Sequence, residues 1–222
     1  SDRWDVVTIQ QASIKSHDVS TYQPYANQLA EFIRQHAPQA QLLIHQTWAY
    51  RVDDPRFART SPPPGEPATQ AEMYQGLRDA YQQIARQLDA GIIPVGDAFY
   101  LADTDGTWGF RVDSAFDKAA AQPPALPDQA HSLHVGWRWR AEKDSRPQLQ
   151  YDGHHANIAG EYLGACVWYE VLFGKSAVGN SFVPRELNIE YAQFLQQTAH
   201  RAVTGLSEEL DEATGAAVQS VR

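Results

Sequence analysis

The sequence has little cysteine, no long apolar run and no excess of basic charge. Cys166 is its single cysteine, so the chain can form neither an internal disulfide nor a zinc site built from several thiolates. No apolar run approaches the ~20 residues that a membrane-spanning helix needs. Its 18 basic and 27 acidic side chains leave a net charge of −9, whereas proteins that grip a phosphate backbone present a basic surface. We therefore expect a soluble protein with no membrane span and no nucleic-acid partner.

What the sequence does contain is an alternation of short apolar runs and helical stripes. Each of the runs Val6–Ile9, Leu42–Ile44 and Ile92–Val95 is followed by polar residues, which is typical of buried parallel strands that end in loops. Between these runs, residues 21–36 and 69–88 repeat apolar side chains at helical spacing. The order strand, helix, strand, helix, strand predicts an α/β domain with a parallel sheet.

Polar residues at the element ends predict how the helices begin. Ser20–Gln23 and Thr69–Glu72 both fit a capping box, in which two side chains satisfy the first N–H groups of a helix. Asp97 follows the third run, and we expect it to cap the next helix rather than to contact a ligand.

The rhythm breaks at about residues 104–150, which we interpret as an insertion near a functional site. Within it, Leu133–Arg140 alternates side chains in the manner of a β-hairpin arm. Two further helices are predicted, over 158–173 and 187–203. We assign residues 1–204 to one domain that carries this arm, and residues 205–222 to an acidic tail.

The strongest chemical signal is the run Asp152-Gly153-His154-His155, just before a predicted helix. A carboxylate three residues before an imidazole can reach its Nδ1–H, fix the tautomer and stabilise the imidazolium. The other ring nitrogen can then take a proton from a hydroxyl nucleophile. In an open parallel sheet such groups belong beyond the carboxyl ends of the strands. The plainer alternative is that Asp152 caps a turn and the histidines are surface residues.

A metal centre is a second interpretation of this region. Its ligands would be His131, His134, Asp152, His154 and His155. Two histidines three residues apart share a face only in a helix, and the alternation around His134 predicts a strand. We therefore expect no metal and no cofactor.

Several blocks of this sequence resemble, in the right order, those of the SGNH (GDSL-like) hydrolases, in particular a bacterial branch described mostly as a domain of unknown function. The matching blocks are Trp4–Ser13, Leu43–Trp48, Ile93–Asp97 and Asp152–Leu163. The resemblance implies a flavodoxin-like three-layer α/β sandwich with a parallel sheet, and a Ser-His-Asp mechanism that acts on esters. His155 would then be the base and Asp152 its orienting carboxylate.

The chain departs from the SGNH pattern at the oxyanion hole and at the nucleophile. Where the superfamily usually has an asparagine, this sequence offers Gln10, Gln11 or Ser13. A glutamine amide can donate the same hydrogen bond from a longer side chain. The first strands and the block with the nucleophilic serine are not found, so we expect the nucleophile outside this chain. An N-terminal fragment or a second chain would complete the sheet, and Ser181, in a Gly-Asn-Ser run, is the runner-up nucleophile.

A few other side chains are candidates to line a pocket. His45 follows the second strand, where it either faces the ligand or serves as a hydrogen-bonded core histidine. Trp48, Trp137 and Trp139 are candidate platforms for a sugar ring, although aromatic side chains in loops more often close a core. Cys166 lies in an apolar helical stripe, and we expect it to be a small buried residue rather than a nucleophile.

The function that these patterns favour is an SGNH-type serine ester hydrolase acting on small or carbohydrate-linked esters, for example by deacetylation. The alternative is a non-catalytic carbohydrate-binding or scaffold module that kept the fold. The missing nucleophile block and the missing asparagine motivate this alternative. The resemblance is to bacterial proteins, and it predicts no compartment.

Overall fold

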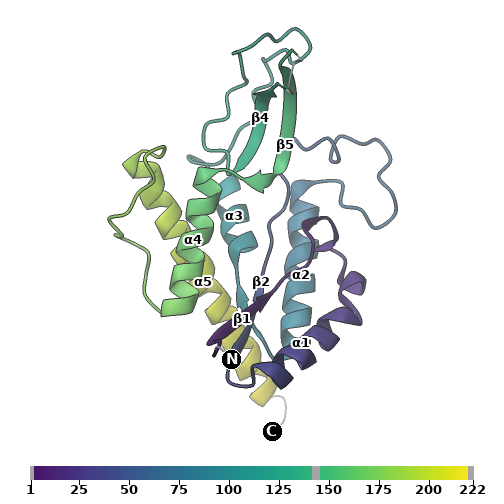
Figure 1. Ribbon diagram of the computed structural model, residues 1–222, viewed down its shortest axis with the longest axis vertical. Coiled ribbons are helices and arrows are strands. Elements are labelled where there is room, and N and C mark those ends of the chain that lie inside the picture. The colour runs from purple at the N-terminus through teal and green to yellow at the C-terminus, as the bar shows by residue number, and fades with distance from the viewer. Residues whose placement is uncertain (1–2, 142–145, 220–222) are drawn as a thin grey trace.

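The computed structural model describes residues 3–141 and 146–219, and it describes side chains as far as Gly205 within the last helix. Figure 1 shows how the elements are arranged. In chain order these are β1 (Val6–Ile9), two 3₁₀ turns (Ser13–Lys15 and Val19–Tyr22), α1 (Tyr25–His36), β2 (Gln41–His45), α2 (Gln70–Leu88), β3 (Gly91–Ile93), α3 (Val95–Asp103), β4 (His134–Arg140), β5 (Gln148–Ala156), α4 (Ile158–Phe173) and α5 (Ile189–Gln219). Among the described helices, none has the length and apolar character needed to cross a membrane.

The three predicted strands form one parallel sheet in the order β1-β2-β3, which confirms the predicted α/β class. β2 lies at the centre, with Thr8 opposite Leu43 on one side and Ile44 opposite Ile92 on the other. β3 is shorter than predicted because Val95, expected as its last residue, already begins α3. β1 lies at the edge of the sheet.

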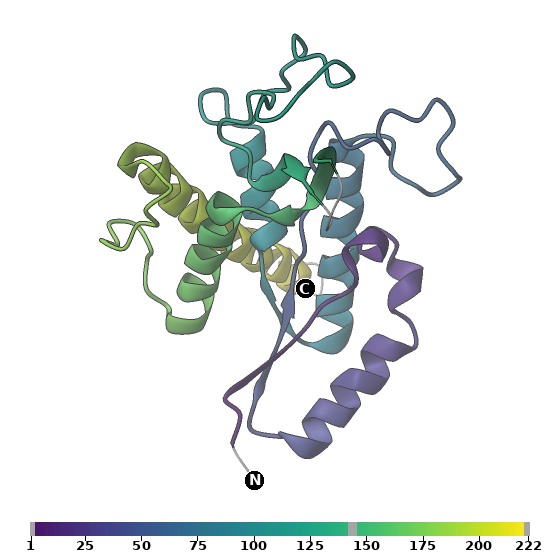
Figure 2. The same cartoon turned by 45° about the horizontal axis from the view of Figure 1, so that its top comes forward.

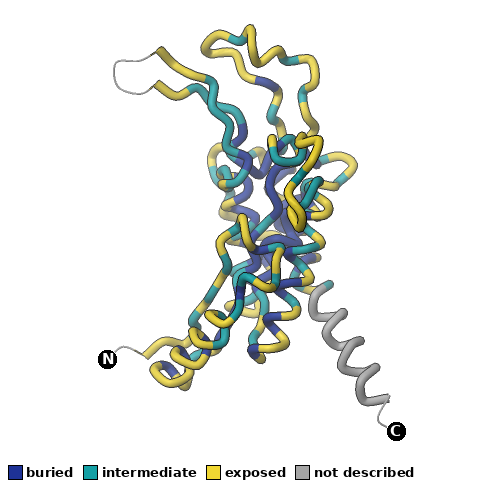
Figure 3. The backbone as a smooth tube through the Cα atoms, turned by 90° about the vertical axis from the view of Figure 1, so that its right-hand side faces the viewer, coloured by how far each residue is buried: buried dark blue, intermediate teal, exposed yellow. Residues whose placement is uncertain are grey.

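Alternate side chains of β2 face two separate cores, and this alternation divides the molecule into layers. Leu42 and Ile44 pack with α1 and α2, whereas Leu43 packs with α3, α4 and α5. Figure 2 shows these two groups of helices on opposite sides of the sheet. In Figure 3 the buried stretches run through the middle of the molecule, while the strands of the hairpin arm and β1 are mostly of intermediate burial. The sheet is therefore the middle layer of three.

Only part of one predicted capping box forms. Thr69 Oγ1 accepts from the N–H of Glu72 at 3.1 Å and caps α2, whereas Glu72 Oε2 accepts from the N–H of Ala68, one residue before the cap, at 2.8 Å. The other prediction is wrong, because α1 begins at Tyr25 and not at residue 21. A residue before a proline avoids helical backbone, and Gln23, which precedes Pro24, is extended with φ −93° and ψ 145°.

Asp97 does not cap the helix that follows β3, contrary to the prediction. It lies inside the first turn of α3, where its carboxylate accepts from Gln46 Nε2 at 3.0 Å. Its N–H donates in return to Gln46 Oε1 at 2.9 Å. This two-way contact joins α3 to the chain directly after β2, and a negative side chain also suits the N-terminal end of a helix.

The predicted arm is an antiparallel hairpin of β4 and β5, which extends away from the sheet in Figure 1. β5 runs farther than expected, so that Asp152–His155 is the end of a strand and not a loop. Asn157 follows and caps α4, whose bounds agree with the predicted helix over 158–173. The backbone of α5 continues through residues 205–219, the segment expected as an acidic tail.

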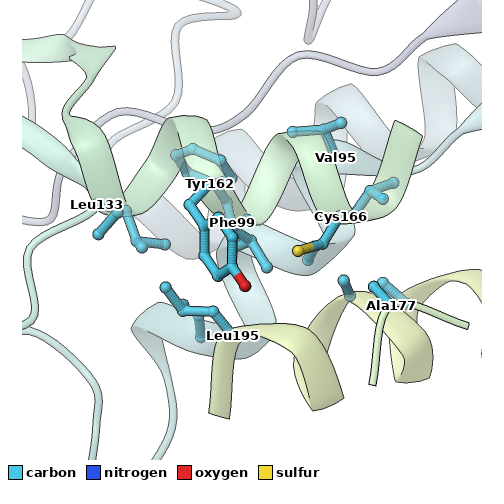
Figure 4. Packing of buried hydrophobic residues seen from close by; sticks show 14 of the residues in the cluster. Val95, Phe99, Leu133, Tyr162, Cys166, Ala177 and Leu195 are labelled. Carbon is cyan, nitrogen blue, oxygen red and sulfur yellow. The ribbon is translucent and has the colours of Figure 1, made fainter. Parts of the chain in front are cut away.

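Cys166 is buried among apolar side chains, as predicted. Figure 4 shows it on α4 among buried side chains that include Val95 and Ala177. Burial, the largest influence, raises the pKa of its thiol to about 11. The thiol is therefore protonated at neutral pH and is a poor nucleophile.

Candidate functional site

Asp152 and His155 form a hydrogen-bonded pair at the end of β5. Both carboxylate oxygens lie 3.0 Å from His155 Nδ1. Oδ1 also accepts from the N–H of His154 at 3.3 Å and from the N–H of His155 at 3.1 Å. A carboxylate in this place keeps the proton on Nδ1 and leaves Nε2 as the basic nitrogen. The ring is 80% exposed and the Asp152 side chain 14%, so an accessible imidazole rests on a mostly buried carboxylate.

Arg138 of β4 is a further partner of this carboxylate. Its Nη2 lies 3.1 Å from Asp152 Oδ2, and Asp152 stands opposite Gly136, two residues from Arg138 along the strand. Burial acts to raise the pKa of Asp152, but the hydrogen bonds from the N–H and ring of His155 and the N–H of His154 outweigh it. The pKa of Asp152 therefore lies below its ordinary value, and the carboxyl is ionised at neutral pH.

The segment after β2 supports the end of β5 through backbone contacts. Trp48 Nε1 donates to the carbonyl of His154 at 2.9 Å. The N–H of Arg51 donates to the carbonyl of Gly153, also at 2.9 Å. These two bonds reach the residues between Asp152 and His155, so the end of β2 positions the pair.

A second carboxylate–imidazole contact lies beside the first. His154 Nε2 is 2.9 Å from Oδ2 of Asp54, whose side chain is only 2% exposed. The ring of Tyr50 lies over the ring of His154, with centroids 4.0 Å apart. Ser13, a sequence candidate, reaches this cluster because its Oγ lies 3.3 Å from the Tyr50 hydroxyl. Chain segments from three parts of the sequence therefore meet at the end of β5.

Arg51 anchors the same segment beneath the arm. Its guanidinium holds Asp53 through two bonds of 2.6 and 2.9 Å, and Nη1 donates to Gln129 Oε1 at 2.8 Å. The Tyr151 hydroxyl donates to Asp53 Oδ1 at 2.7 Å. Gly136 passes close by with φ +69°, and a Cβ there would lie 2.2 Å from Arg51 Nη1. Only glycine fits this approach of β4 to the buried ion pair.

The candidate side chains at the ends of β1 and β2 differ in whether their polar groups are already hydrogen-bonded. Gln11 Nε2 donates to the carbonyl and hydroxyl of Thr21 at 3.0 and 3.1 Å, so its amide is engaged. Gln10 is exposed, lines a cavity of about 260 Å³ beside β1, and makes no side-chain hydrogen bond within the described residues. His45 Nδ1 accepts from Trp168 Nε1 at 3.1 Å, and burial lowers the pKa of His45 to about 4. His45 is therefore a neutral, hydrogen-bonded imidazole at neutral pH.

The candidate tryptophans lie in different places. Trp48 stacks on Phe99, with centroids 4.6 Å apart, beneath the end of β5. Trp137 and Trp139 lie on the face of β4 opposite to Arg138, because side chains alternate along a strand. The ring centroids of Trp137 and Tyr151 are 4.9 Å apart, and Trp139 Nε1 donates to the carbonyl of Ala125 at 2.8 Å. These two indoles pack against the arm and its own loop.

Ser181 is exposed in the connection between α4 and α5. Figure 1 shows this connection on the side of α4 that faces away from the sheet. No hydrogen bond joins Ser181 to Asp152 or His155 in the part of the chain that the structure describes.

The histidines of the metal interpretation do not converge. His134 is buried, and its Nε2 lies 3.0 Å from the carbonyl of Ala49. The ring of His131 packs against those of Trp108 and Tyr191, with centroid distances of 4.9 Å in each case. Among the side chains that the structure describes, in residues 3–141 and 146–205, no three histidine, cysteine or acidic groups are placed to hold a metal ion.

Two residues of this site were missed by sequence reasoning. Asp54 belongs to a loop of mixed composition and is 100 residues from His154 in the sequence. Arg138 lies in the predicted hairpin strand, but only the register of β4 against β5 brings it to Asp152. The available signal was the acidic pair Asp53-Asp54 beyond the end of a parallel strand, where ligands usually bind.

Comparison with known proteins supports the fold. No family model and no curated protein matches this sequence. The chain is similar to the crystal structure of a DUF4886 family protein from Bacteroides uniformis, with a TM-score of 0.64 and 23% identity. The match covers 92% of this chain and 64% of that one. The chain thus spans less than two thirds of its structural neighbour, and at this identity the likeness concerns the fold alone.

Proposed function

We propose that this chain contributes the general base and its orienting carboxylate to a serine ester hydrolase of the SGNH type. The observation that carries the proposal is the pair Asp152–His155, in which both carboxylate oxygens lie 3.0 Å from Nδ1 of a largely exposed imidazole. An imidazole held in this way can accept a proton at Nε2 and is stabilised once it is charged.

In the proposed reaction, His155 Nε2 removes the proton of a serine hydroxyl while the serine oxygen attacks the ester carbonyl. The imidazolium then gives this proton to the leaving alcohol as the tetrahedral intermediate collapses to an acyl-serine. A water molecule, deprotonated by the same ring, attacks the acyl group and releases the acid and the free serine. Asp152 stays ionised throughout, in accord with its lowered pKa.

The serine, in this proposal, belongs to another polypeptide segment that pairs with β1 and completes a flavodoxin-like sandwich. In the described chain β1 pairs only with β2, so its second edge is open to a further strand. Near the end of β1, α1 exposes Tyr25, which is 71% accessible and lines the same cavity as Ile9. The 260 Å³ cavity between β1 and α1 adds apolar surface that a further segment would cover.

We assign the oxyanion donor to Gln10 in preference to Gln11. The amide of Gln11 is committed to Thr21, whereas that of Gln10 is exposed at the carboxyl end of β1. A donor in this place can approach a carbonyl that is attacked by a serine on the neighbouring strand. Ser13 and His45 would act as support, since both side chains are hydrogen-bonded within the protein.

The substrate class that we propose is a small or carbohydrate-linked ester, such as an acetyl group on a sugar. The open position of the His155 ring is compatible with this class, because the leaving alcohol can depart toward solvent. The candidate platforms Trp137 and Trp139 contact the loop of the arm, so a sugar would need to displace that loop to stack on them.

The proposal is tested with a fluorophosphonate probe on the protein isolated from its host with every segment that accompanies it. We expect one labelled serine, and a loss of labelling rate of at least about 100-fold in His155→Gln. His200→Gln is the matched control, because His200 Nδ1 makes the same kind of contact, 2.9 Å from the buried carboxylate of Glu170, near the opposite end of α4 from His155. Equal labelling of His155→Gln and the unaltered protein would overturn the assignment.

A non-catalytic carbohydrate-binding or scaffold module is the second candidate. Two observations favour it. The Gln11 amide is already hydrogen-bonded to Thr21, and within the described residues no serine hydroxyl is hydrogen-bonded to His155. The same probe discriminates the two. No labelled serine together with saturable glycan binding, followed through tryptophan fluorescence, would favour the module.

A further inference from the structure

The carboxylate of Asp152 serves two cationic or proton-donating side chains at once. Oδ2 accepts from Arg138 Nη2 at 3.1 Å and lies 3.0 Å from His155 Nδ1. Oδ1 meets the two backbone N–H groups and the same ring nitrogen. A carboxylate offers about four lone-pair directions, so these donors use its full capacity. The imidazole therefore shares its carboxylate with a guanidinium.

Arg138 brings a permanent positive charge to this place. A guanidinium does not deprotonate at any pH at which the protein is folded. The Arg138 side chain is 36% exposed, but its Nε is buried and has no hydrogen-bond partner among the described residues. Asp152 is the acidic side chain that pairs with Arg138, so the two charges are fixed as neighbours across the hairpin.

The charged and titratable groups of the cluster around His155 come from three elements. Asp152 and His154 belong to β5, Arg138 belongs to β4, and Asp54 reaches His154 from the segment after β2. Asp54 lies 2.9 Å from His154, and its carboxylate contacts that ring rather than the ring of His155. Among the side chains that the structure describes in contact with Asp152, Arg138 is thus the one whose positive charge does not depend on pH.

We propose that Arg138 is a positioning residue that sets how readily His155 takes up a proton, through the carboxylate that the two side chains share. The positive charge of Arg138 opposes a second positive charge on the ring. Arg138 therefore keeps the imidazole neutral, and able to accept a proton from serine, at a lower pH than Asp152 alone would allow. The consequence for catalysis rests on the proposed function, whereas the effect on ring protonation does not.

The first test is an NMR titration of the His155 ring in Arg138→Gln. We expect its midpoint to move to higher pH by about half a unit or more, as a charge two hydrogen bonds away would cause in a partly exposed site. Arg138→Lys, which keeps the charge, should restore most of the original midpoint. At high salt the difference should narrow, because an exposed charge is screened.

Arg140→Gln is the matched control, since Arg140 lies on the same strand and face, is exposed, and has no contact with Asp152 within the described residues. It removes the same charge from the protein and should leave the midpoint unchanged. Arg138→Met, which keeps the apolar part of the side chain, is measured alongside so that the result does not depend on the folding of one variant. An unshifted midpoint in both Arg138 variants, or an equal shift in Arg140→Gln, would overturn the proposal.

Kinetics separate this inference from the proposed function. If both hold, the acidic limb of the kcat/KM profile for p-nitrophenyl acetate in Arg138→Gln moves to higher pH. The shift in pH units equals that of the ring titration, and the plateau at high pH changes little. A shifted ring titration with no ester turnover in the protein isolated with every segment that accompanies it supports the role of Arg138 and removes the hydrolase. Turnover with an unshifted titration removes the role of Arg138 and leaves the hydrolase.

Discussion

The carboxyl group of Asp103, at the end of α3, should make the protein less stable as the pH rises. Its Oδ2 accepts from Gln70 Nε2 at 2.9 Å, while Oδ1 is buried without a hydrogen-bond partner among the described residues. Burial, the largest influence, raises the pKa of Asp103 to about 7, although the Gln70 bond and the Arg51 charge lower it. The same Gln70 amide donates to the carbonyl of Tyr50, so Asp103 is part of the support of the candidate site.

The size of the effect follows from the difference in proton affinity between the two states. The ordinary pKa of 3.8 applies to the unfolded chain, so the folded protein binds this proton more tightly. The resulting stability is fully present below pH 3.8 and is lost as the pH rises through about 7. Between pH 5 and 8 the difference in bound protons falls from nearly one to nearly none and is about one half at pH 7. At about 1.4 kcal/mol per pH unit for a whole proton, the loss over this range is a little under 3 kcal/mol.

Urea unfolding at pH 5 and pH 8 measures this loss for the unaltered protein and for Asp103→Asn, whose carboxamide cannot ionise. The unaltered protein should lose about 3 kcal/mol more than the variant over this range. Asp79→Asn, at an exposed position of α2, is the control and should keep the full dependence on pH. An equal loss in the unaltered protein and in Asp103→Asn would refute the reasoning.

Three other predictions concern the fold. Gly136→Ala should lower the free energy of unfolding by about 2 kcal/mol or more in thermal denaturation, because its φ is +69° and the new Cβ would meet Arg51. The control Gly106→Ala, with no atom within 4 Å of its added Cβ, should change the free energy of unfolding little. Thr69→Ala should cost about 1 kcal/mol in the same assay, through the lost cap of α2. Cys166 should react with iodoacetamide at pH 8 only after unfolding, since burial raises its thiol pKa to about 11; rapid labelling of the native protein would contradict the packing of α4.

Much of the fold follows from local patterns. Leu42, Leu43 and Ile44 form a strand buried on both faces, and such a run requires helices on both sides of the sheet. The contact between Asp152 and His155 spans three residues, so their spacing alone brings the side chains within reach. The start of α1 was not predictable from the helical stripe, because the extended residue before Pro24 outweighs it.

The missing part of the site depends on contacts that are distant in the sequence. Asp54 meets His154 across 100 residues, and the register of β4 against β5 decides whether Arg138 or a neighbour faces Asp152. A shift of one residue in that register would turn Trp137 toward Asp152 and Arg138 away from it. Patterns read along the chain carry no information on such a choice.

The claim that Asp152 acts through His155 is tested most directly by a double-mutant cycle on ester turnover. Steady-state hydrolysis of p-nitrophenyl acetate is measured on the protein isolated with every segment that accompanies it, in its unaltered form and as Asp152→Asn, His155→Ala and the double variant. Since the carboxylate works only by orienting and stabilising the ring, the double variant should be no slower than His155→Ala alone. Losses that multiply in the double variant, or full activity in His155→Ala, would contradict this account.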